Sequence, residues 1–216
     1  MFIVIRIIIV LVFFISLMLA IKRVKATSKS VLYIMAIIFS LLMITGLSIL
    51  PFENSFVSFN SPESAYDYAD FGKSEVLLVV EGKNSDLVIG NNDGVHNYLI
   101  IPKNKEGWKI GRGIDVKKIA QKYFGEIRVC VYQHRPTDEY FITIADTNGG
   151  YLDLSDSNNS KFSKIEKKVD SIGKTMVTYY ANIPELDSAY WINITQEGDK
   201  GTVLLSPFRE TEGRFS

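Results

Sequence analysis

The sequence predicts a membrane-anchored α+β protein, in which two N-terminal transmembrane helices precede a β-rich extracytoplasmic region. Two long apolar runs, residues 2–21 and 31–50, open the chain, and a basic stretch, residues 22–30, separates them. After residue 50 the sequence changes to short β-branched and aromatic runs between Gly, Asn and Asp residues. Such runs are typical of strands joined by turns, so the strands are expected to dominate this region.

Each apolar run has the length of a membrane-spanning helix. About 20 residues of α-helix cross the roughly 30 Å hydrocarbon core of a bilayer. The run 31–50 carries no charged residue, and the one charge in the run 2–21, Arg6, lies near the chain's start. A long arginine side chain at that depth reaches the interface, so it does not prevent insertion. The sequence therefore predicts a helical hairpin over residues 1–50.

The basic stretch between the runs predicts the orientation of this hairpin. It holds Lys22, Arg23, Lys25 and Lys29, and the first fifty residues contain no Asp or Glu. Short loops rich in Lys and Arg stay in the cytoplasm. The N-terminus and residues 51–216 are therefore expected outside. A cleaved signal peptide fits less well, because the charge follows the first run and the second run ends without an A-x-A pattern.

Composition narrows the function of residues 51–216. This part has a net charge of −5, so a nucleic-acid partner, which requires a basic face, is not expected. Cys130 is the single cysteine, which excludes an intrachain disulfide. A small extracellular domain of a eukaryote usually contains paired cysteines, so this region suits a bacterial cell envelope better.

The extracytoplasmic region is predicted to contain three α-β-β-β units. Each unit opens with a short amphipathic pattern that ends on a glycine, and strand-like runs follow it. In the first unit, Asp93-Gly94 between two apolar runs predicts a β-hairpin turn. The expected units are residues 61–112, 115–160 and 163–208, and their expected helices are residues 61–72, 115–125 and 163–173.

Several short motifs resemble those of a group of small two-span membrane proteins from low-GC Gram-positive bacteria. The motifs are PFEN at 51–54, SPE at 61–63, VEG at 80–82, IPK at 101–103 and GWK at 107–109. The resemblance implies an anchored envelope domain and implies no established activity.

The segment HRPTDEYF contains the strongest candidates for acid–base chemistry. His134, Asp138 and Glu139 lie around a predicted proline turn, which could place an imidazole beside two carboxylates. Cys130 and His134 share a face of one predicted strand, but their backbones are about 13 Å apart, too far for a nucleophile–base pair. Charged residues at hairpin tips usually lie at the surface in contact with solvent. The sequence therefore does not predict a catalytic site formed by these residues.

Metal and cofactor sites are also not expected. Asp146, Asp153 and Asp156 lie in an oxygen-rich stretch of the kind that can bind Ca²⁺, but their spacing does not fit a calcium-binding loop. Two histidines and one cysteine do not supply a typical zinc site, and GWKIGRG lacks the spacing of a phosphate-binding loop. A sugar-stacking surface could be formed by five aromatic residues, Trp108, Tyr140, Phe141, Tyr190 and Trp191. Aromatic residues on strands, however, usually fill the core.

The function expected from the sequence is a membrane-anchored extracytoplasmic interaction module without chemistry of its own. Its expected partners are the membrane and an envelope or membrane protein. Two alternatives stay open: a cell-envelope enzyme that uses His134 with nearby carboxylates, and an accessory or sensor subunit of a membrane complex.

Overall fold

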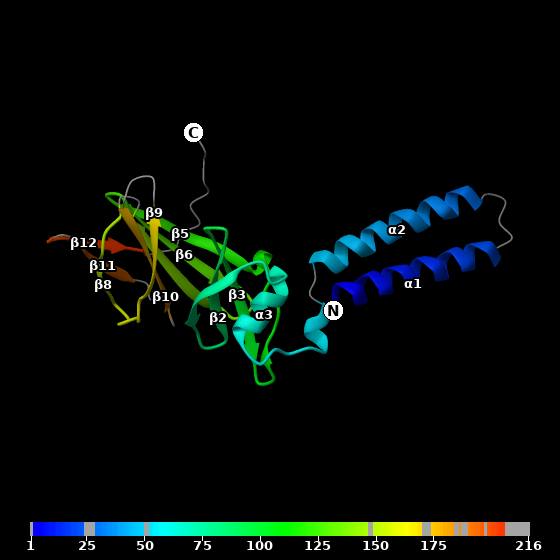
Figure 1. Ribbon diagram of the computed structural model, residues 1–216, viewed down its shortest axis with the longest axis horizontal. Helices are drawn as coiled ribbons and strands as arrows, with labels where there is room; N and C mark the ends of the chain where they lie inside the picture. Colours follow the sequence, from blue (N-terminus) through cyan, green and yellow to red (C-terminus); the bar gives the residue numbers. More distant parts are fainter. Residues whose placement is uncertain are drawn as a thin grey trace. The chain divides into compact units, whose positions relative to one another are not determined.

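The computed structural model describes residues 2–23, 29–49, 52–146, 149–169, 174–183, 186, 190–196 and 198–205. Two compact units make up the chain, Met1–Val57 and Ser58–Ser216 (Figure 1). Three parts of the predictions lie outside the described residues: Lys25 of the basic loop, the expected helix end at Gly173, and the end of the third unit beyond residue 205.

The first unit is a pair of antiparallel α-helices, α1 (Phe2–Arg23) and α2 (Lys29–Ile49) (Figure 1). The aromatic rings of Phe13 and Phe39 join the two helices, with centroids 5.6 Å apart. Ala36 and Ser40 of α2 are buried, and the Ser40 hydroxyl donates to the Ala36 carbonyl oxygen at 2.8 Å. Small side chains one turn apart let neighbouring helices approach closely. A short 3₁₀ helix, Phe52–Ser55, follows.

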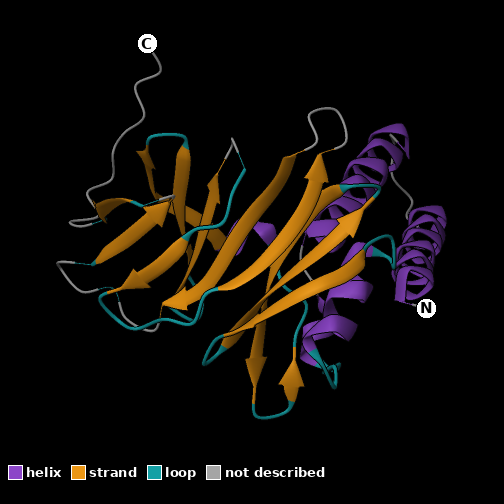
Figure 2. Ribbon diagram, turned by 60° about the vertical axis from the view of Figure 1, so that its left-hand side comes forward, coloured by secondary structure: helices purple, strands orange, loops and turns teal. Residues whose placement is uncertain are grey.

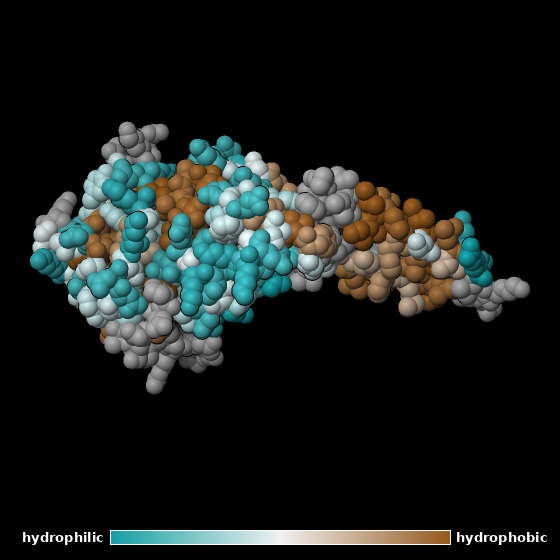
Figure 3. Space-filling view, turned by 90° about the horizontal axis from the view of Figure 1, so that it is seen from below, coloured by the Kyte–Doolittle hydropathy of each residue, from teal (hydrophilic) through white to brown (hydrophobic). Residues whose placement is uncertain are grey.

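Among the described residues, one segment is both long and apolar enough to cross a membrane, Lys29–Gly46 of α2, with a mean hydropathy of 1.9. Its side chains are mostly exposed, and hydrophobic residues cover much of the helix pair's visible described surface (Figure 3). Signal sequences share this length and composition. The structure therefore shows one apolar helix near the N-terminus that suits a membrane span or a signal sequence.

The second unit opens with the helix predicted at residues 61–72. Helix α3 (Pro62–Asp70) begins after Ser61, whose side-chain oxygen accepts a hydrogen bond from the Ser64 backbone N–H at 3.2 Å. Serine is a favoured N-cap residue and proline is favoured at the first helical position, so Ser61-Pro62 suits the start of this helix. The helix ends at Phe71, which adopts a left-handed conformation (φ 61°) immediately before Gly72.

A four-stranded antiparallel sheet follows, and its strand order is the chain order. The predicted hairpin turn is confirmed: Asp93 and Gly94 both have positive φ, 49° and 81°, as a two-residue turn of the type found in hairpins requires. The strands are β1 (Glu75–Glu81), β2 (Ser85–Asn92), β3 (Val95–Asn104) and β4 (Gly107–Trp108).

The helix predicted at residues 115–125 is wrong, because this segment forms strand β5 (Val116–Phe124) after a single 3₁₀ turn, Gly113–Asp115. Strand β5 pairs with β6 (Ile127–His134), and Gly125, at φ 56°, lies in the turn between them. The pairing shifts between Lys118 and Ala120, as at a β-bulge. A bulge interrupts the alternation of a strand, and this interruption produced the apparent helical spacing of the apolar residues.

The helix predicted at residues 163–173 is also wrong. Residues Ser163–Val169 form strand β9, which pairs with β10 (Lys174–Ile183). In this strand Ile165 is buried and its neighbours Lys164 and Glu166 are exposed, which is the alternation of a strand. The α-β-β-β pattern therefore holds only for the first of the three expected units.

The remaining strands form two further sheets. One has five strands in the order β5-β6-β7-β10-β9, and the other has three in the order β12-β11-β8. Figure 2 shows the strands of this unit in orange. Their remaining bounds are β7 (Glu139–Asp146), β8 (Asp153–Asp156), β11 (Trp191–Gln196) and β12 (Asp199–Leu204).

Helix α3 and the three sheets form four layers, and an apolar cluster lies between each layer and the next. Helix α3 packs on one face of the four-stranded sheet, through Ala65 and Tyr66 against Val88 and Ile101. The opposite face packs on the five-stranded sheet, whose own far face forms the largest cluster with the three-stranded sheet. On β7, Phe141 belongs to the first of these interfaces, whereas Ile142 and Ile144 belong to the second. The five-stranded sheet is thus buried on both faces.

Candidate functional site

The structure brings two of the three predicted acid–base residues together. His134 ends β6 and Glu139 begins β7, and the two are directly paired across the hairpin. Both are buried, with 0% of His134 and 5% of Glu139 exposed. Asp138 is exposed in the turn at φ 52°, where its carboxylate accepts hydrogen bonds from Gln133 and Tyr140, so it does not join this pair.

The Glu139 carboxylate is bonded to the turn between β1 and β2. One oxygen accepts the backbone N–H groups of Lys83, at 2.5 Å, and Asn84, at 2.8 Å. The other accepts the Ser85 hydroxyl at 2.5 Å. Hydrogen bonds to an ionised carboxylate are stronger than those between neutral groups. Glu139 therefore fastens the four-stranded sheet to the hairpin of the five-stranded sheet.

His134 lies in the same cluster through a bridging hydroxyl. Its Nδ1 is 2.7 Å from Thr137 Oγ1, which is 3.3 Å from Ser85 Oγ. Burial lowers the pKa of His134, an effect that Asp115 and Glu139 oppose. Its buried Nε2 has no hydrogen-bond partner among the described residues. The imidazole is therefore held neutral at physiological pH and linked to Glu139 by two hydroxyl groups.

The chain of groups Glu139–Ser85–Thr137–His134 has the composition of an acid–base relay. Its end groups, however, are not accessible to a substrate. Both ends are buried, and each carboxylate oxygen of Glu139 is bonded within the protein. Catalytic groups must come within hydrogen-bonding reach of a substrate. Cys130, on the same strand as His134, is also buried.

Asp86, which the sequence analysis did not single out, forms a second anchor for the same turn. One carboxylate oxygen accepts the Gly82 N–H at 3.1 Å and the Lys103 ammonium at 2.8 Å, and the other accepts the Trp108 indole N–H at 2.5 Å. The sequence feature that could have identified Asp86 is its position: a charged residue, next to Ser85, at the start of an otherwise apolar strand. The turn 82–85 is thus held from both sides by buried carboxylates.

The three aspartates considered for Ca²⁺ do not form a cluster. Asp146, at the end of β7, accepts a hydrogen bond from Gln196 at 2.6 Å. Asp156 accepts the Tyr190 hydroxyl at 2.6 Å, and Asp153 lies exposed on β8. Among the residues that the structure describes, no three His, Cys, Asp or Glu side chains could together hold a metal ion.

The aromatic residues considered for sugar stacking do not form an exposed surface. Phe141 and Tyr190 are fully buried, and Trp191 is half-buried. Trp108 donates to Asp86, and Tyr140 donates to Asp138, so these half-buried side chains support the structure around them. These aromatics are components of the core and its margins.

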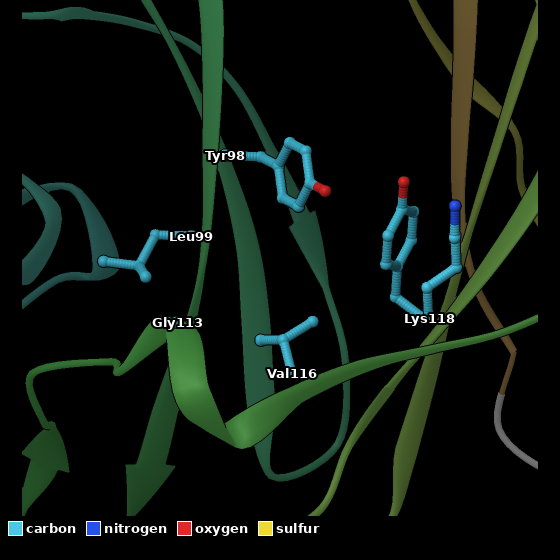
Figure 4. Close-up of a pocket in the computed structure, with 6 residues that line it drawn as sticks. Tyr98, Leu99, Gly113, Val116 and Lys118 are labelled. Carbon is cyan, nitrogen blue, oxygen red and sulfur yellow. The ribbon is translucent and has the colours of Figure 1, made fainter.

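An open cleft lies between the four-stranded and five-stranded sheets. It has a volume of about 470 Å³, within the range of roughly 300–1,000 Å³ common for small-molecule sites. Figure 4 shows Tyr98 extending from β3, with Val116 below and the Lys118 side chain on the far side of the cleft. Its lining residues are Tyr98, Leu99, Gly113, Val116, Lys118 and Tyr132.

The two tyrosines give the cleft its chemical character. The rings of Tyr98 and Tyr132 are tilted by 54°, with centroids 5.4 Å apart, and 46% of Tyr98 is exposed. Burial raises the pKa of Tyr132, and its hydrogen bond with the Tyr98 side chain raises it further. The Tyr132 phenol is therefore a neutral hydrogen-bonding group at physiological pH. The two tyrosines belong to strands of different sheets, so no spacing in the sequence predicts that they meet.

Comparisons with protein-family models, with curated proteins and with solved structures find no match to this chain. The resemblance to small two-span envelope proteins therefore stays a prediction from the sequence motifs.

Proposed function

We propose that this protein is a membrane-anchored binding module of the bacterial cell envelope, with residues 51–216 outside the cytoplasm. The observation that carries the binding function is the open Tyr98–Tyr132 cleft between two sheets. The strongest acid–base set of the described residues, around His134 and Glu139, is buried and bonded internally. This contrast favours binding over catalysis.

The proposed anchor is the helix pair α1 and α2, with both helices spanning the bilayer. Helix α2 supplies the long apolar segment, and α1 has 22 residues, enough to cross the hydrocarbon core. Lys22, Arg23, Lys25 and Lys29 are proposed to keep the connection in the cytoplasm. This arrangement places both the N-terminus and the β-rich unit outside.

Cysteine labelling of intact cells tests this anchor. We would place a single cysteine in a short N-terminal extension, at Ser28 or at Lys105, and apply a membrane-impermeant maleimide. The N-terminal cysteine and K105C are expected to react in intact cells, and S28C only after lysis. The unaltered chain measures the background, because its one cysteine, Cys130, is buried.

Each other labelling pattern contradicts a defined part of the proposal. Protection of the N-terminal cysteine together with reaction of K105C would leave α2 as a single span. Protection of K105C in intact cells would place the β-rich unit in the cytoplasm and overturn the proposed location. Loss of residues 1–50 from the mature protein, measured by intact mass spectrometry, would show that they are a signal sequence.

A further inference from the structure

We propose that the Tyr98–Tyr132 cleft binds an anionic pyranose, a six-membered sugar ring that carries a carboxylate or a phosphate. The inference rests on the proposed binding function and assigns the ligand class to its cleft. Three features of the cleft carry it: its aromatic faces, its hydroxyl groups and its positive charge.

The aromatic faces suit the apolar face of a sugar ring. Tyr98 lies on β3 and Tyr132 on β6, so their contact bridges two sheets. Tyr98 is 46% exposed, which leaves much of its side chain available to a ligand. Leu99 and Val116 add apolar lining. A rigid aromatic side chain offers a large contact area with little loss of conformational entropy, and its hydroxyl adds a polar contact.

The polar groups suit a hydroxylated ligand. The phenol groups of Tyr98 and Tyr132 can donate and accept hydrogen bonds, and both residues line the cleft together with Lys118. A purely apolar ligand would bury these groups without satisfying the hydrogen-bonding capacity that remains beyond their mutual bond, which costs free energy. A ring with several hydroxyls can satisfy them.

The charge favours an anion. The Lys118 ammonium donates to the neutral Gln121 amide oxygen at 2.7 Å, and no carboxylate of the described residues pairs with it. The segment that contains all the lining residues, positions 97–132, has eight basic and three acidic residues, a net charge of +5. The whole of residues 51–216 carries −5. The cleft thus lies in the basic segment of an acidic region, as expected for a site that attracts an anion.

Calorimetric titration of the full chain tests the assignment. The protein is placed in nanodiscs of zwitterionic lipid, which avoids detergents with sugar headgroups. The probes are D-glucuronate, glucose 6-phosphate and methyl glucoside. We expect the two anionic sugars to bind at least tenfold more tightly than methyl glucoside, and the stronger of the two identifies the preferred anionic group.

Matched variants locate the site. Y98A and K118Q are each expected to weaken binding of the preferred probe about tenfold. Y151A removes a still more exposed tyrosine outside the cleft, and K122Q removes the same charge from the same strand outside the lining, so both should bind as the unaltered chain does. Raising the salt concentration should weaken binding of the anionic probes, because salt screens exposed charges.

The outcomes are distinct. Equal binding of methyl glucoside overturns the anionic class, and equal losses in Y98A and Y151A overturn the location. Absence of binding by all three probes overturns the ligand class, while the cysteine-labelling pattern independently decides the proposed location. Unfolding temperatures of all variants show whether a loss of binding arises from loss of the fold.

Discussion

Glu139 shows how a single side chain joins separate parts of this fold. Its carboxylate accepts two backbone N–H groups and one hydroxyl from the turn between β1 and β2, although it lies more than fifty residues further along the chain. Removing an acceptor from partly buried donors costs about 1–3 kcal/mol, because the donors lose their partner without regaining water. The interface between the two sheets therefore depends on this residue.

The carboxyl-to-amide change E139Q is expected to lower the free energy of unfolding by about 2 kcal/mol, because it removes the charge that strengthens these bonds. The same change at the exposed neighbour, D138N, is expected to alter it by less than about 0.5 kcal/mol. Denaturant titration of both variants measures the difference. Equal effects would mean that the Glu139 bonds contribute nothing specific.

His134 predicts a pH dependence of stability. Burial lowers its folded-state pKa below the ordinary 6.5, so below that pH the unfolded chain binds more protons than the folded one. Its facing groups Asp115 and Glu139 oppose the shift and Arg112 supports it. The contribution of His134 to the free energy of unfolding is therefore fully present above about pH 6.5. It is lost as the pH decreases toward the lowered pKa, by at most about 1.4 kcal/mol per pH unit.

The measurement is the free energy of unfolding between pH 7 and pH 5 in chains that carry H96Q, since burial also lowers the pKa of His96. Adding H134Q should reduce the dependence on pH, whatever it does to stability at pH 7. An unchanged slope would show that other groups cause the loss of stability in acid.

At the scale of elements, the edge strands were the hardest to predict. Strands β5 and β9 form the two edges of the five-stranded sheet, and both carry several lysines. Lysines on edge strands discourage pairing with other chains. They also remove the apolar alternation that identifies a strand, and in β5 the bulge near Ala120 removes it further. The inner strands β6, β7 and β10 keep their apolar character and agree with the strand runs predicted from the sequence.

A close contact between elements gives a test of the packing of β12 on β5. A Cβ atom at Gly201 would lie 2.0 Å from the ring of Phe124. G201A is therefore expected to lower the free energy of unfolding by about 1–3 kcal/mol. The control G113A introduces the same methyl group where no atom lies within 4 Å, so it should have little effect.

The variant F124L removes the obstructing ring and should reduce the cost of G201A. A double-mutant cycle by denaturant titration is expected to give a coupling of at least about 1 kcal/mol. Additive effects would contradict the contact between β12 and β5.

At the scale of the whole molecule, the chain combines an apolar helix pair with a β-rich unit of four layers. The basic connection 22–30 is proposed to orient the whole chain. Replacing Lys22, Arg23, Lys25 and Lys29 with glutamine should therefore produce a mixture of orientations, because the charge difference across the hairpin falls.

The K105C label in intact cells measures this mixture, as the fraction of chains that becomes protected. Four lysine-to-glutamine changes in the β-rich unit, at Lys83, Lys122, Lys161 and Lys164, form the control and should leave the orientation unchanged, because distant charges contribute little. An unaltered orientation after the loop replacement would show that the loop charges do not set it.

The sequence by itself determined the features that depend on neighbouring residues. These are the two apolar helices, the Ser61 cap of α3, the Asp93-Gly94 turn and the inner strands. Local chemistry specifies them, since caps, turns and periodic burial involve residues only a few positions apart.

Only the tertiary structure decided which distant residues meet. It placed residues 116–124 and 163–169 at the edges of a sheet, where strand pairing outweighed their local helical signals. It joined Glu139 to the turn 82–85 and Tyr98 to Tyr132, contacts between strands of different sheets. No spacing in the sequence encodes such contacts, because they follow from how the sheets stack, and that stacking is fixed by the burial of all their apolar faces together.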